Sequence, residues 1–529
     1  MRFLVKLFLS AFLVFAVPLS VGAQDDVVVT KQYDDGGMYE GTFKNGLQHG
    51  LGTYRLPNGY EYSGEWVDGE IFGIGVAKFP NGSVYEGNFI KGKPEGSGKI
   101  IFADGGTYEG SWLDGKITGQ GVAVYANGSR FKGGFLEAMH HGQGVMTNPD
   151  GYVYDGDWVN GVKEGLAKIT YPDGSVYSGS VIRGAREGKG TLEMTEGLIF
   201  EGFWENGEIN GLGKLTQPNG DVYKGELSNG KRNGNGIVEY ANGDVYDGEF
   251  KEDQRAGQGT FLGSDGYKYL GEWAEGQIQG LGEVTYPDGS FYAGNFVNGL
   301  ASGKGKIQYP DGSVYEGEWK AGVIEGIGRA QYSNGVVYEG GFKNARNHGF
   351  GIMDYGNGYI YEGEWKDGNR HGKGMSKFAD GMVYEGDYLN GKRHGIGKIT
   401  LADGFRYEGE WLAGEITGKG IATYSNGDVY EGQFNKGMGH GHGTFRMKSD
   451  SIIDRYTGMW ASDKWDGFGT LVLKDGSRIN GKWKKNRLEY GDYEGFNGVI
   501  KSGKWQGNWE FLSEGFSKNQ YGAEFTGSF

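Results

Sequence analysis

The chain has 529 residues, of which 107 are glycine, 9 are proline and none is cysteine, and its formal net charge is −15. Glycine is far above its usual share of about 7%, yet it does not fall at every third position and proline is scarce, so collagen is excluded. An acidic chain without a long basic stretch is not a general nucleic-acid binder, and an aromatic content of 15% is unlike that of disordered proteins.

The N-terminus predicts a signal peptide over residues 1–23. A positive start is followed by a short apolar run, LFLSAFLVFAV, and by small residues that end at Ala23, so we expect cleavage between Ala23 and Gln24. The alternative is an uncleaved membrane anchor, but the apolar run is short for a span of about 20 residues and Pro18 interrupts it. We expect an exported protein of the periplasm or the extracellular space, with association with the cell envelope left open. The absence of cysteine, and hence of disulfides, favours a bacterial source.

Residues 24–32 are expected to be a short linker, and a repeat array follows over residues 33–486. In each repeat an anchor residue, usually aromatic, has glycine two positions later, and the anchors recur every 23 residues. One step is longer by three residues, which lie in the stretch 448–455. Residues 487–529 depart from the pattern and are expected to form a C-terminal cap, which repeat arrays need. The anchors are Tyr39, Tyr62, Tyr85, Tyr108, Phe131, Tyr154, Tyr177, Phe200, Tyr223, Tyr246, Tyr269, Tyr292, Tyr315, Tyr338, Tyr361, Tyr384, Tyr407, Tyr430, Tyr456 and Ile479.

The segment YEGEWKDGNRHGKG, from Tyr361 to Gly374, shows the pattern of one unit. In this segment and in its unbroken register along the chain, the protein resembles the MORN repeat family, with about 20 units. The resemblance implies successive β-hairpins laid side by side. It also implies a tendency toward scaffolding, dimerisation and membrane association, and it implies no particular enzymatic activity.

Turn residues give the same structure independently. Each unit has two short alternating runs separated by Pro-Asp-Gly, Ala-Asn-Gly or a similar turn, which suits a three-residue loop with a type I turn and a glycine bulge. This loop places Tyr309 opposite Ser313 and Gly305 opposite Gly317. The sequence therefore predicts an all-β fold, an elongated single-layer antiparallel meander of hairpins that is twisted or curled.

The predicted register gathers aromatic residues and glycine on one face, and charged, mostly acidic residues on the other. On the aromatic face, glycine between two aromatic residues leaves room for the rings to lie flat over the backbone. An uncovered aromatic face of this size would have to be covered by curling, by a second chain or by a partner. Two examples of this face are Tyr315, Gly317 and Trp319, and Tyr361, Gly363 and Trp365.

Histidine and arginine residues supply the main candidates for an interaction site. They could form a basic ridge that contacts phosphates or an acidic partner, or the histidines could simply belong to a loop consensus. Histidines spaced by whole hairpins, about 10 Å apart, cannot share one metal ion. Glutamates on a flat, wet sheet face do not form a catalytic pair, so we expect no metal, no cofactor and no catalytic residue. The candidates are Arg346, His348, Arg370, His371, Arg393 and His394.

These features predict a non-enzymatic exported scaffold that binds protein partners and self-associates, most simply as a homodimer through its C-terminal units. A lipid-binding protein of the membrane or envelope is the first alternative, since Tyr and Trp suit a membrane interface, although an acidic surface opposes binding to anionic lipids. Binding of glycans by the aromatic stripe is less favoured. The weakest join is expected between Val181 and Phe250, where Val181 and Leu227 replace the bulkier residue of other units.

Overall fold

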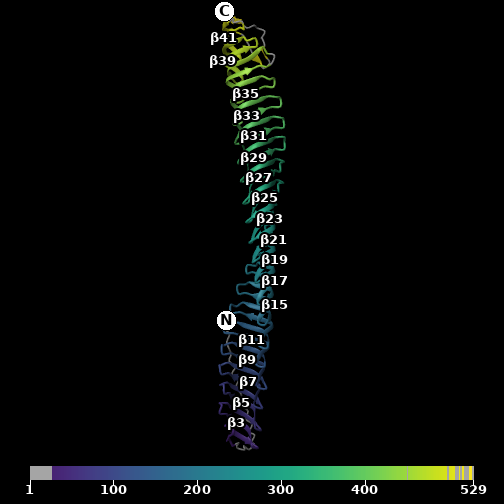
Figure 1. Cartoon of the computed structure of the whole chain (residues 1–529), viewed down its shortest axis with the longest axis vertical. Coiled ribbons are helices and arrows are strands. Elements are labelled where there is room, and N and C mark those ends of the chain that lie inside the picture. Colours follow the sequence, from purple (N-terminus) through teal and green to yellow (C-terminus); the bar gives the residue numbers. More distant parts are fainter. Residues whose placement is uncertain are drawn as a thin grey trace, which may run out of the picture. The chain divides into compact units, whose positions relative to one another are not determined.

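The computed structural model describes residues 27–448, 451–496, 500–506, 511–512, 515–516 and 524–526 (Figure 1). The predicted signal peptide and its cleavage site at Ala23 and Gln24 lie outside the described residues. The chain divides into two compact units, Met1–Ala241 and Asn242–Phe529. All regular elements in the described residues are strands, and none of these residues forms a helix with the length and apolar character needed to cross a membrane.

In the first unit each strand pairs antiparallel with the next strand of the chain, and after the short first strand, strands of seven and nine residues alternate. The strands are β1 (Val29–Gln32), β2 (Met38–Lys44), β3 (Leu47–Arg55), β4 (Glu61–Val67), β5 (Glu70–Lys78), β6 (Val84–Ile90), β7 (Lys93–Ile101), β8 (Thr107–Leu113), β9 (Lys116–Val124), β10 (Arg130–Leu136), β11 (Met139–Thr147), β12 (Val153–Val159), β13 (Val162–Thr170), β14 (Val176–Ile182), β15 (Ala185–Glu193), β16 (Ile199–Glu205), β17 (Glu208–Thr216), β18 (Val222–Ser228) and β19 (Lys231–Glu239).

The second unit continues the same alternation, and its last strands are less regular: β45 pairs with β42, and β43 pairs with β44. The strands are β20 (Val245–Lys251), β21 (Gln254–Leu262), β22 (Lys268–Ala274), β23 (Gln277–Thr285), β24 (Phe291–Val297), β25 (Leu300–Gln308), β26 (Val314–Lys320), β27 (Val323–Gln331), β28 (Val337–Lys343), β29 (Arg346–Asp354), β30 (Ile360–Lys366), β31 (Asn369–Lys377), β32 (Val383–Leu389), β33 (Lys392–Thr400), β34 (Arg406–Leu412), β35 (Glu415–Thr423), β36 (Val429–Asn435), β37 (Met438–Arg446), β38 (Ile453–Ala461), β39 (Lys464–Leu473), β40 (Arg478–Lys484), β41 (Arg487–Glu494), β42 (Ile500–Gln506), β43 (Phe511–Leu512), β44 (Gly515–Phe516) and β45 (Glu524–Thr526).

The three-residue loop between β25 and β26 has the predicted geometry. The N–H of Tyr309 donates to the carbonyl of Ser313 at 2.8 Å, and the N–H of Gly312 donates to the carbonyl of Tyr309 at 3.0 Å. Gly312 has φ = 87°, a left-handed conformation that glycine adopts without strain. Gly305 lies opposite Gly317, so the predicted loop, register and antiparallel meander are confirmed.

The other turn of each repeat is tighter, and a β-bulge follows it. Between β26 and β27 a two-residue loop has positive φ at both positions, 47° at Ala321 and 81° at Gly322, as in a type I′ turn. Trp319 lies opposite Ile324 and Gly317 lies opposite Gly328, so one residue of β26 faces three of β27. Because β27 has two extra residues, an even number, its side chains keep their alternation between the two faces.

The start of the array and the longer step between two anchors, Tyr430 and Tyr456, differ from the other repeats. Part of the segment expected to be a linker, residues 24–32, forms β1, because its backbone pairs with β2: Val29 lies opposite Gly41 and Gln32 opposite Met38. One of the three extra residues of the stretch 448–455 lies in the turn between β37 and β38, and the other two lengthen β38 at its start. Arg446 lies opposite Arg455, so the register between β37 and β38 is unchanged, whereas the pairing of β38 with β39 is irregular between Ile453 and Arg455.

The aromatic face forms the core of the repeats, and the side chains of the chain itself bury it. Tyr315 is only 2% exposed and Trp319 only 9%. The ring of Tyr315 meets Trp319 and Phe342 edge to face, with centroids 5.6 and 5.1 Å apart, and its hydroxyl donates to the carbonyl of Glu318 at 2.9 Å. Of the three ways to cover this face, packing within the chain is therefore the one that the structure shows.

The same arrangement recurs one repeat pair later, where Tyr361 and Trp365 are buried and meet edge to face at 5.1 Å. Gly363 lies beneath this packing: a Cβ there would stand 2.5 Å from the Cα of Gly374 and 2.8 Å from the hydroxyl oxygen of Tyr361. The predicted structural role of the glycines on this face agrees with these distances.

Candidate interaction groove

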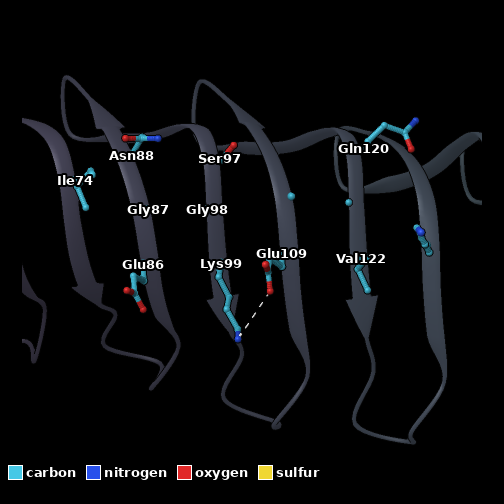
Figure 2. Close-up of a pocket in the computed structure, with 13 residues that line it drawn as sticks. Ile74, Glu86, Gly87, Asn88, Ser97, Gly98, Lys99, Glu109, Gln120 and Val122 are labelled. Carbon is cyan, nitrogen blue, oxygen red and sulfur yellow. Dashed lines mark ion pairs between the residues drawn. The ribbon is translucent and has the colours of Figure 1, made fainter. Parts of the chain in front are cut away.

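An open groove lies on the polar face of the sheet, opposite the buried rings. In the first unit it has a volume of about 770 Å³ (Figure 2). Its floor includes the backbone of Gly87 and Gly98, where a Cβ would point to the aromatic face, toward Tyr85, and the side chains of the residues before and after each glycine stand as walls. Figure 2 shows Lys99 reaching toward Glu109 on the neighbouring strand, with Nζ and Oε2 4.0 Å apart.

Equivalent positions line further stretches of groove inside the second unit. One stretch lies around Gly317 and Gly328, and another around Gly374 and Gly386. Because these residues occupy the same positions in their repeats, the groove arises from the repeat itself and occurs in both compact units.

An apolar row follows one wall of the groove. Its members stand twelve residues after an anchor, directly before a glycine of the floor except at Leu166, which precedes Ala167, and they are well exposed; Ile327, for example, is 64% exposed. Scattered exposed apolar residues are normal, but residues that recur at one position of the groove can be covered together by one partner. The row comprises Leu51, Ile74, Leu166, Leu212, Leu281, Ile327, Phe350, Ile396 and Phe468. The fifth residue after the anchor, beside the tight turn, is a second exposed apolar position, as at Val67 and Ile90.

The same wall contains carboxylates that stabilise the bulges. Glu318 accepts a hydrogen bond from the N–H of Ile327 at 3.1 Å, and Glu364 accepts one from Lys373 at 3.0 Å. A bulge removes partners from the ladder, and the carboxylate supplies an acceptor in their place. This row of acidic residues therefore has a structural role that the sequence analysis did not find.

Asp387 is the member of this wall whose titration is altered most clearly. Partial burial alone would raise the pKa of its carboxyl. Two contacts outweigh that effect and lower the pKa below its usual value: Lys373 Nζ lies 2.6 Å from Oδ1, and the N–H of Ile396 donates to Oδ2 at 2.9 Å. The carboxylate is thus held in its charged form at the edge of the groove.

The structure divides the six predicted interaction residues between two sides of the sheet. Arg370 lies on the aromatic side, where Nη2 donates to the carbonyl of Gly391 at 2.8 Å and the guanidinium lies 5.3 Å from the ring of Tyr388. Arg393 lies there too, 5.2 Å from the ring of Trp411. These two arginines pack over the aromatic core through cation–π contacts.

The histidines lie at the bulges, beside the next tight turn. His348 Nδ1 accepts a long hydrogen bond of 3.5 Å from the N–H of Asp367, while Arg346 is exposed. His371 Nδ1 is buried without a hydrogen-bond partner. At the same position of an earlier repeat, Glu95 accepts a hydrogen bond of 2.8 Å from the N–H of Asp114. The position therefore favours a side chain that can accept a hydrogen bond from the turn, which supports the loop-consensus interpretation. His394 occupies the same position of its repeat, and the basic ridge remains a prediction.

Metal binding gains no support from the arrangement of side chains. Over the part of the chain that the structure describes, no group of three or more His, Cys, Asp or Glu residues is placed to hold a metal ion.

The comparison with known families decides the identity of the array, because the family model of the MORN repeat matches 19 consecutive segments. The chain belongs to the MORN repeat family. As a MORN repeat protein it is a scaffold of the protein-interaction or membrane-associated kind. The matched segments are residues 39–59, 62–84, 85–107, 108–130, 131–151, 154–176, 177–198, 200–222, 223–245, 246–266, 269–291, 292–314, 315–337, 338–358, 361–383, 384–406, 407–429, 430–451 and 456–478.

Individual relatives add little to this assignment. A stretch of 50 residues, 8% of this MORN repeat chain, is 44% identical to alsin of Rattus norvegicus and covers 3% of that protein. The SAS-4 TCP domain of Drosophila melanogaster, solved with a proline-rich motif of Ana2, is 15% identical over 34% of this chain and 85% of its own, with a TM-score of 0.19. Virginiamycin B lyase of Staphylococcus aureus is 16% identical over 56% of this chain and 96% of its own, with a TM-score of 0.10. Scores this low support no inference about fold or function.

Proposed function

We propose that this MORN repeat protein is an exported, non-enzymatic scaffold that binds protein partners along the groove of its polar face. The apolar row carries the proposal. The array buries the tyrosines and tryptophans of its aromatic face within the chain, yet leaves leucine, isoleucine and phenylalanine exposed at a repeated position of the groove. Export is supported by the N-terminal signal pattern of the sequence.

The chemistry of the groove suits a protein segment better than a small molecule. In the second unit the position of the apolar row reads Lys304, Ile327, Phe350 and Lys373 in successive repeats, so two neighbouring apolar side chains stand between cationic ones along the wall. Burying an exposed apolar side chain is worth about 1.5–3 kcal/mol when it is complete. A partner that covers several repeats would gain several such contacts in register.

A groove variant tests this proposal: Ile327, Phe350 and Ile396 are replaced by serine. The matched control replaces Val323, Leu389 and Leu412, which are also exposed and apolar but do not belong to the apolar row. We expect proteins cross-linked to the native scaffold in an envelope fraction to be lost from the groove variant and kept by the control. Retention of the same partners by the groove variant would contradict the proposal, as would flotation with protein-free liposomes that depends on the same three residues.

We also propose that the protein self-associates through the free edge of β1. The aromatic face gives no reason for dimerisation, because the chain buries it. The edge gives one: within the described part of the chain, β1 pairs only with β2, and the valines at its start are exposed, with Val28 at 62%. An unpaired strand edge with apolar side chains favours pairing with another chain.

A further inference from the structure

A second row of aromatic residues lies at the three-residue loops, at the edge of the aromatic face and on the other side of the sheet from the groove. Each member directly precedes the loop residues Pro-Asp-Gly or their equivalents. Tyr309 is 37% exposed and Tyr332 is 39% exposed, whereas the core ring of Tyr315 is 2% exposed. We call these residues the turn-tip row. Two runs of three are Phe79, Phe102 and Tyr125 in the first unit and Tyr286, Tyr309 and Tyr332 in the second. Tyr355 and Phe378 follow the second run in the next two repeats, but their rings are stacked on the ring of Tyr359, with centroids 4.6 Å apart.

Between two neighbouring members the surface is hollowed. A hollow of about 310 Å³ includes Phe79 and Phe102 among its walls, and the buried side chains of Tyr85, Ile100 and Trp112 also line it. Asn81, which also lines it, uses its side-chain oxygen to accept the N–H of Ser83 at 2.9 Å, and so its amide NH₂ group remains as a donor. An aromatic wall with a polar group beside it matches a pyranose ring, which presents C–H bonds on its faces and hydroxyl groups around its edge.

The spacing of the turn-tip row selects among polysaccharides. Neighbouring strands lie about 4.8 Å apart, so successive turn tips, two strands apart, are separated by about 10 Å. That distance is the length of one disaccharide in an extended β-1,4-linked glycan, in which alternate sugars present the same face. An α-1,4-linked glucan coils and does not keep this repeat.

We propose that the turn-tip row binds an extended β-1,4-linked glycan, with one aromatic ring stacked against every second sugar. Tyr286, Tyr309 and Tyr332 follow one another in consecutive repeats, so one glycan chain can contact all three. The net charge of −15 disfavours polyanionic glycans and favours uncharged ones. The buried aromatic stripe of Tyr315 and Trp319 takes no part, because its rings are covered.

The length of the ligand gives the first test, made with the chain from Gln24 to Phe529. Calorimetry compares cello- and chito-oligosaccharides of two, four and six sugars with maltohexaose. We expect affinity for a β-1,4 series to rise several-fold with each added disaccharide, because each one reaches a further ring at high effective concentration. Absence of binding to both β-1,4 series, equal affinity at all lengths, or equal binding of maltohexaose would overturn the proposal.

Variants give the second test, by migration in gels that contain a soluble cellulose derivative and by retention on insoluble chitin. The turn-tip variant replaces the six residues of the two runs by serine, and we expect it to lose at least tenfold in affinity. The matched control replaces six groove residues by serine and should bind as the native chain does, which also separates this proposal from that of the groove. The control residues are Leu51, Ile74, Leu281, Ile327, Phe350 and Ile396.

The same variants settle the nearest competing role, contact with a membrane. Vesicles of neutral and of anionic phospholipid are floated with the native chain and with the turn-tip variant. Flotation that needs the six aromatic residues, without glycan binding, would overturn the proposal in favour of a membrane surface. If circular dichroism shows that the turn-tip variant does not fold, the oligosaccharide series on the native chain decides alone.

Discussion

Gly317 shows why glycine recurs in this chain at the scale of single residues. A Cβ at this position would lie 2.5 Å from the hydroxyl oxygen of Tyr315 and 2.5 Å from the Cα of Gly328. The tyrosine ring therefore lies against a pair of glycines on adjacent strands, and any side chain there would push the ring or the strands apart. The requirement is for space, since the backbone of Gly317 is not in the left-handed region.

We expect Gly317→Val to destabilise the hairpins around β26 by about 3 kcal/mol, because the added atoms overlap backbone that cannot move away. Hydrogen exchange of the amides of β26 and β27 measures this locally, which suits a long array that does not unfold as one unit. The control is Glu316→Val, which places the same side chain on the exposed face of the same strand. Equal exchange in the two variants would refute the account of the glycine pair.

The lowered pKa of Asp387 predicts a pH dependence of the hairpin between β32 and β33. Because the folded-state pKa lies below the unfolded value of about 3.9, the carboxylate stabilises the fold fully above that value. The contribution is lost as pH falls through the folded-state pKa. The protection factor of the Ile396 amide, which corrects for the slower intrinsic exchange at low pH, should therefore fall more steeply on acidification than it does in Asp387→Asn, which lacks the charge. Parallel profiles of the two proteins would contradict the role given to this carboxylate.

At the scale of the element, the three-residue loop depends on one side chain. In the loop after β25, Asp311 Oδ1 accepts the N–H of Ser313 at 2.8 Å, and Asp or Asn makes the same bond in the other Pro-Asp-Gly and Asn-Gly loops. In the loop between β15 and β16, Glu196 stands at this position with a side chain one carbon longer. The backbone turn still closes, with the N–H of Met194 donating to the carbonyl of Leu198 at 2.8 Å.

We expect Glu196→Asp to stabilise this hairpin by about 1 kcal/mol, because the shorter carboxylate can accept the N–H of Leu198. Local hydrogen exchange in β15 and β16 measures the change. Glu196→Gln keeps the length of the native side chain and serves as the control, with no gain expected. A gain in the Gln variant equal to that in the Asp variant would show that the charge of Glu196, and not its length, weakens the loop.

Comparing the two turns of a repeat shows what the sequence could and could not predict. Pro310, Asp311 and Gly312 define their loop by local conformational preference, so the register and the two faces followed from the sequence alone. The tight turn at Ala321 and Gly322 lacks such a signature, although in other repeats the same turn reads Asn-Gly or Asp-Gly, as at Asn298-Gly299, which is typical of a type I′ turn. The bulge that follows has a positive φ at Gly326, and a glycine in a strand does not by itself indicate a bulge. The acceptor role of the groove carboxylates depends on that bulge and was missed with it.

The covering of the rings and the apolar row were missed for different reasons. Burial of Tyr315 arises from sheet twist and from contacts with the next repeat, which periodicity does not specify. The apolar row was visible only in part, because the twelfth residue after each anchor reads Leu51 and Ile74, then Ser97 and other polar residues in several repeats, and two apolar residues in succession again only at Ile327 and Phe350. An interrupted row of this kind does not stand out from the polar residues around it until the exposure of its members is known.

At the scale of the whole molecule, the stretch between Val181 and Phe250 should be cut first in limited proteolysis. Trp204 Nε1 is buried without a hydrogen-bond partner, whereas Trp319 Nε1 donates to the carbonyl of Gly305 at 3.2 Å. The boundary between the two compact units also falls in this stretch. Stability in a repeat array is roughly a sum over units and their interfaces, so the poorest interfaces open first. Cleavage that begins between Trp273 and Phe434 would contradict this expectation.

Self-association is tested by light scattering of the chain from Gln24 to Phe529 over a range of concentrations. We expect a two-fold dimer. Val27→Lys combined with Val28→Lys places charges at the edge of β1 and should give a monomer, whereas deletion of residues 487–529 tests the C-terminal contact predicted from the sequence. A native chain that is monomeric at every concentration would contradict both sites of contact.

The pairing of each strand with its neighbour in the chain has a consequence for how the protein folds. Within each unit, a strand such as β26 finds its partners among the residues made just before and just after it, although the fold is all-β. Contact order is therefore low, and the chain can assemble like a zipper from one hairpin to the next. Chain length then adds little to the search for the native state, so an array of this type can be extended or shortened by whole repeats without changing how any one hairpin forms.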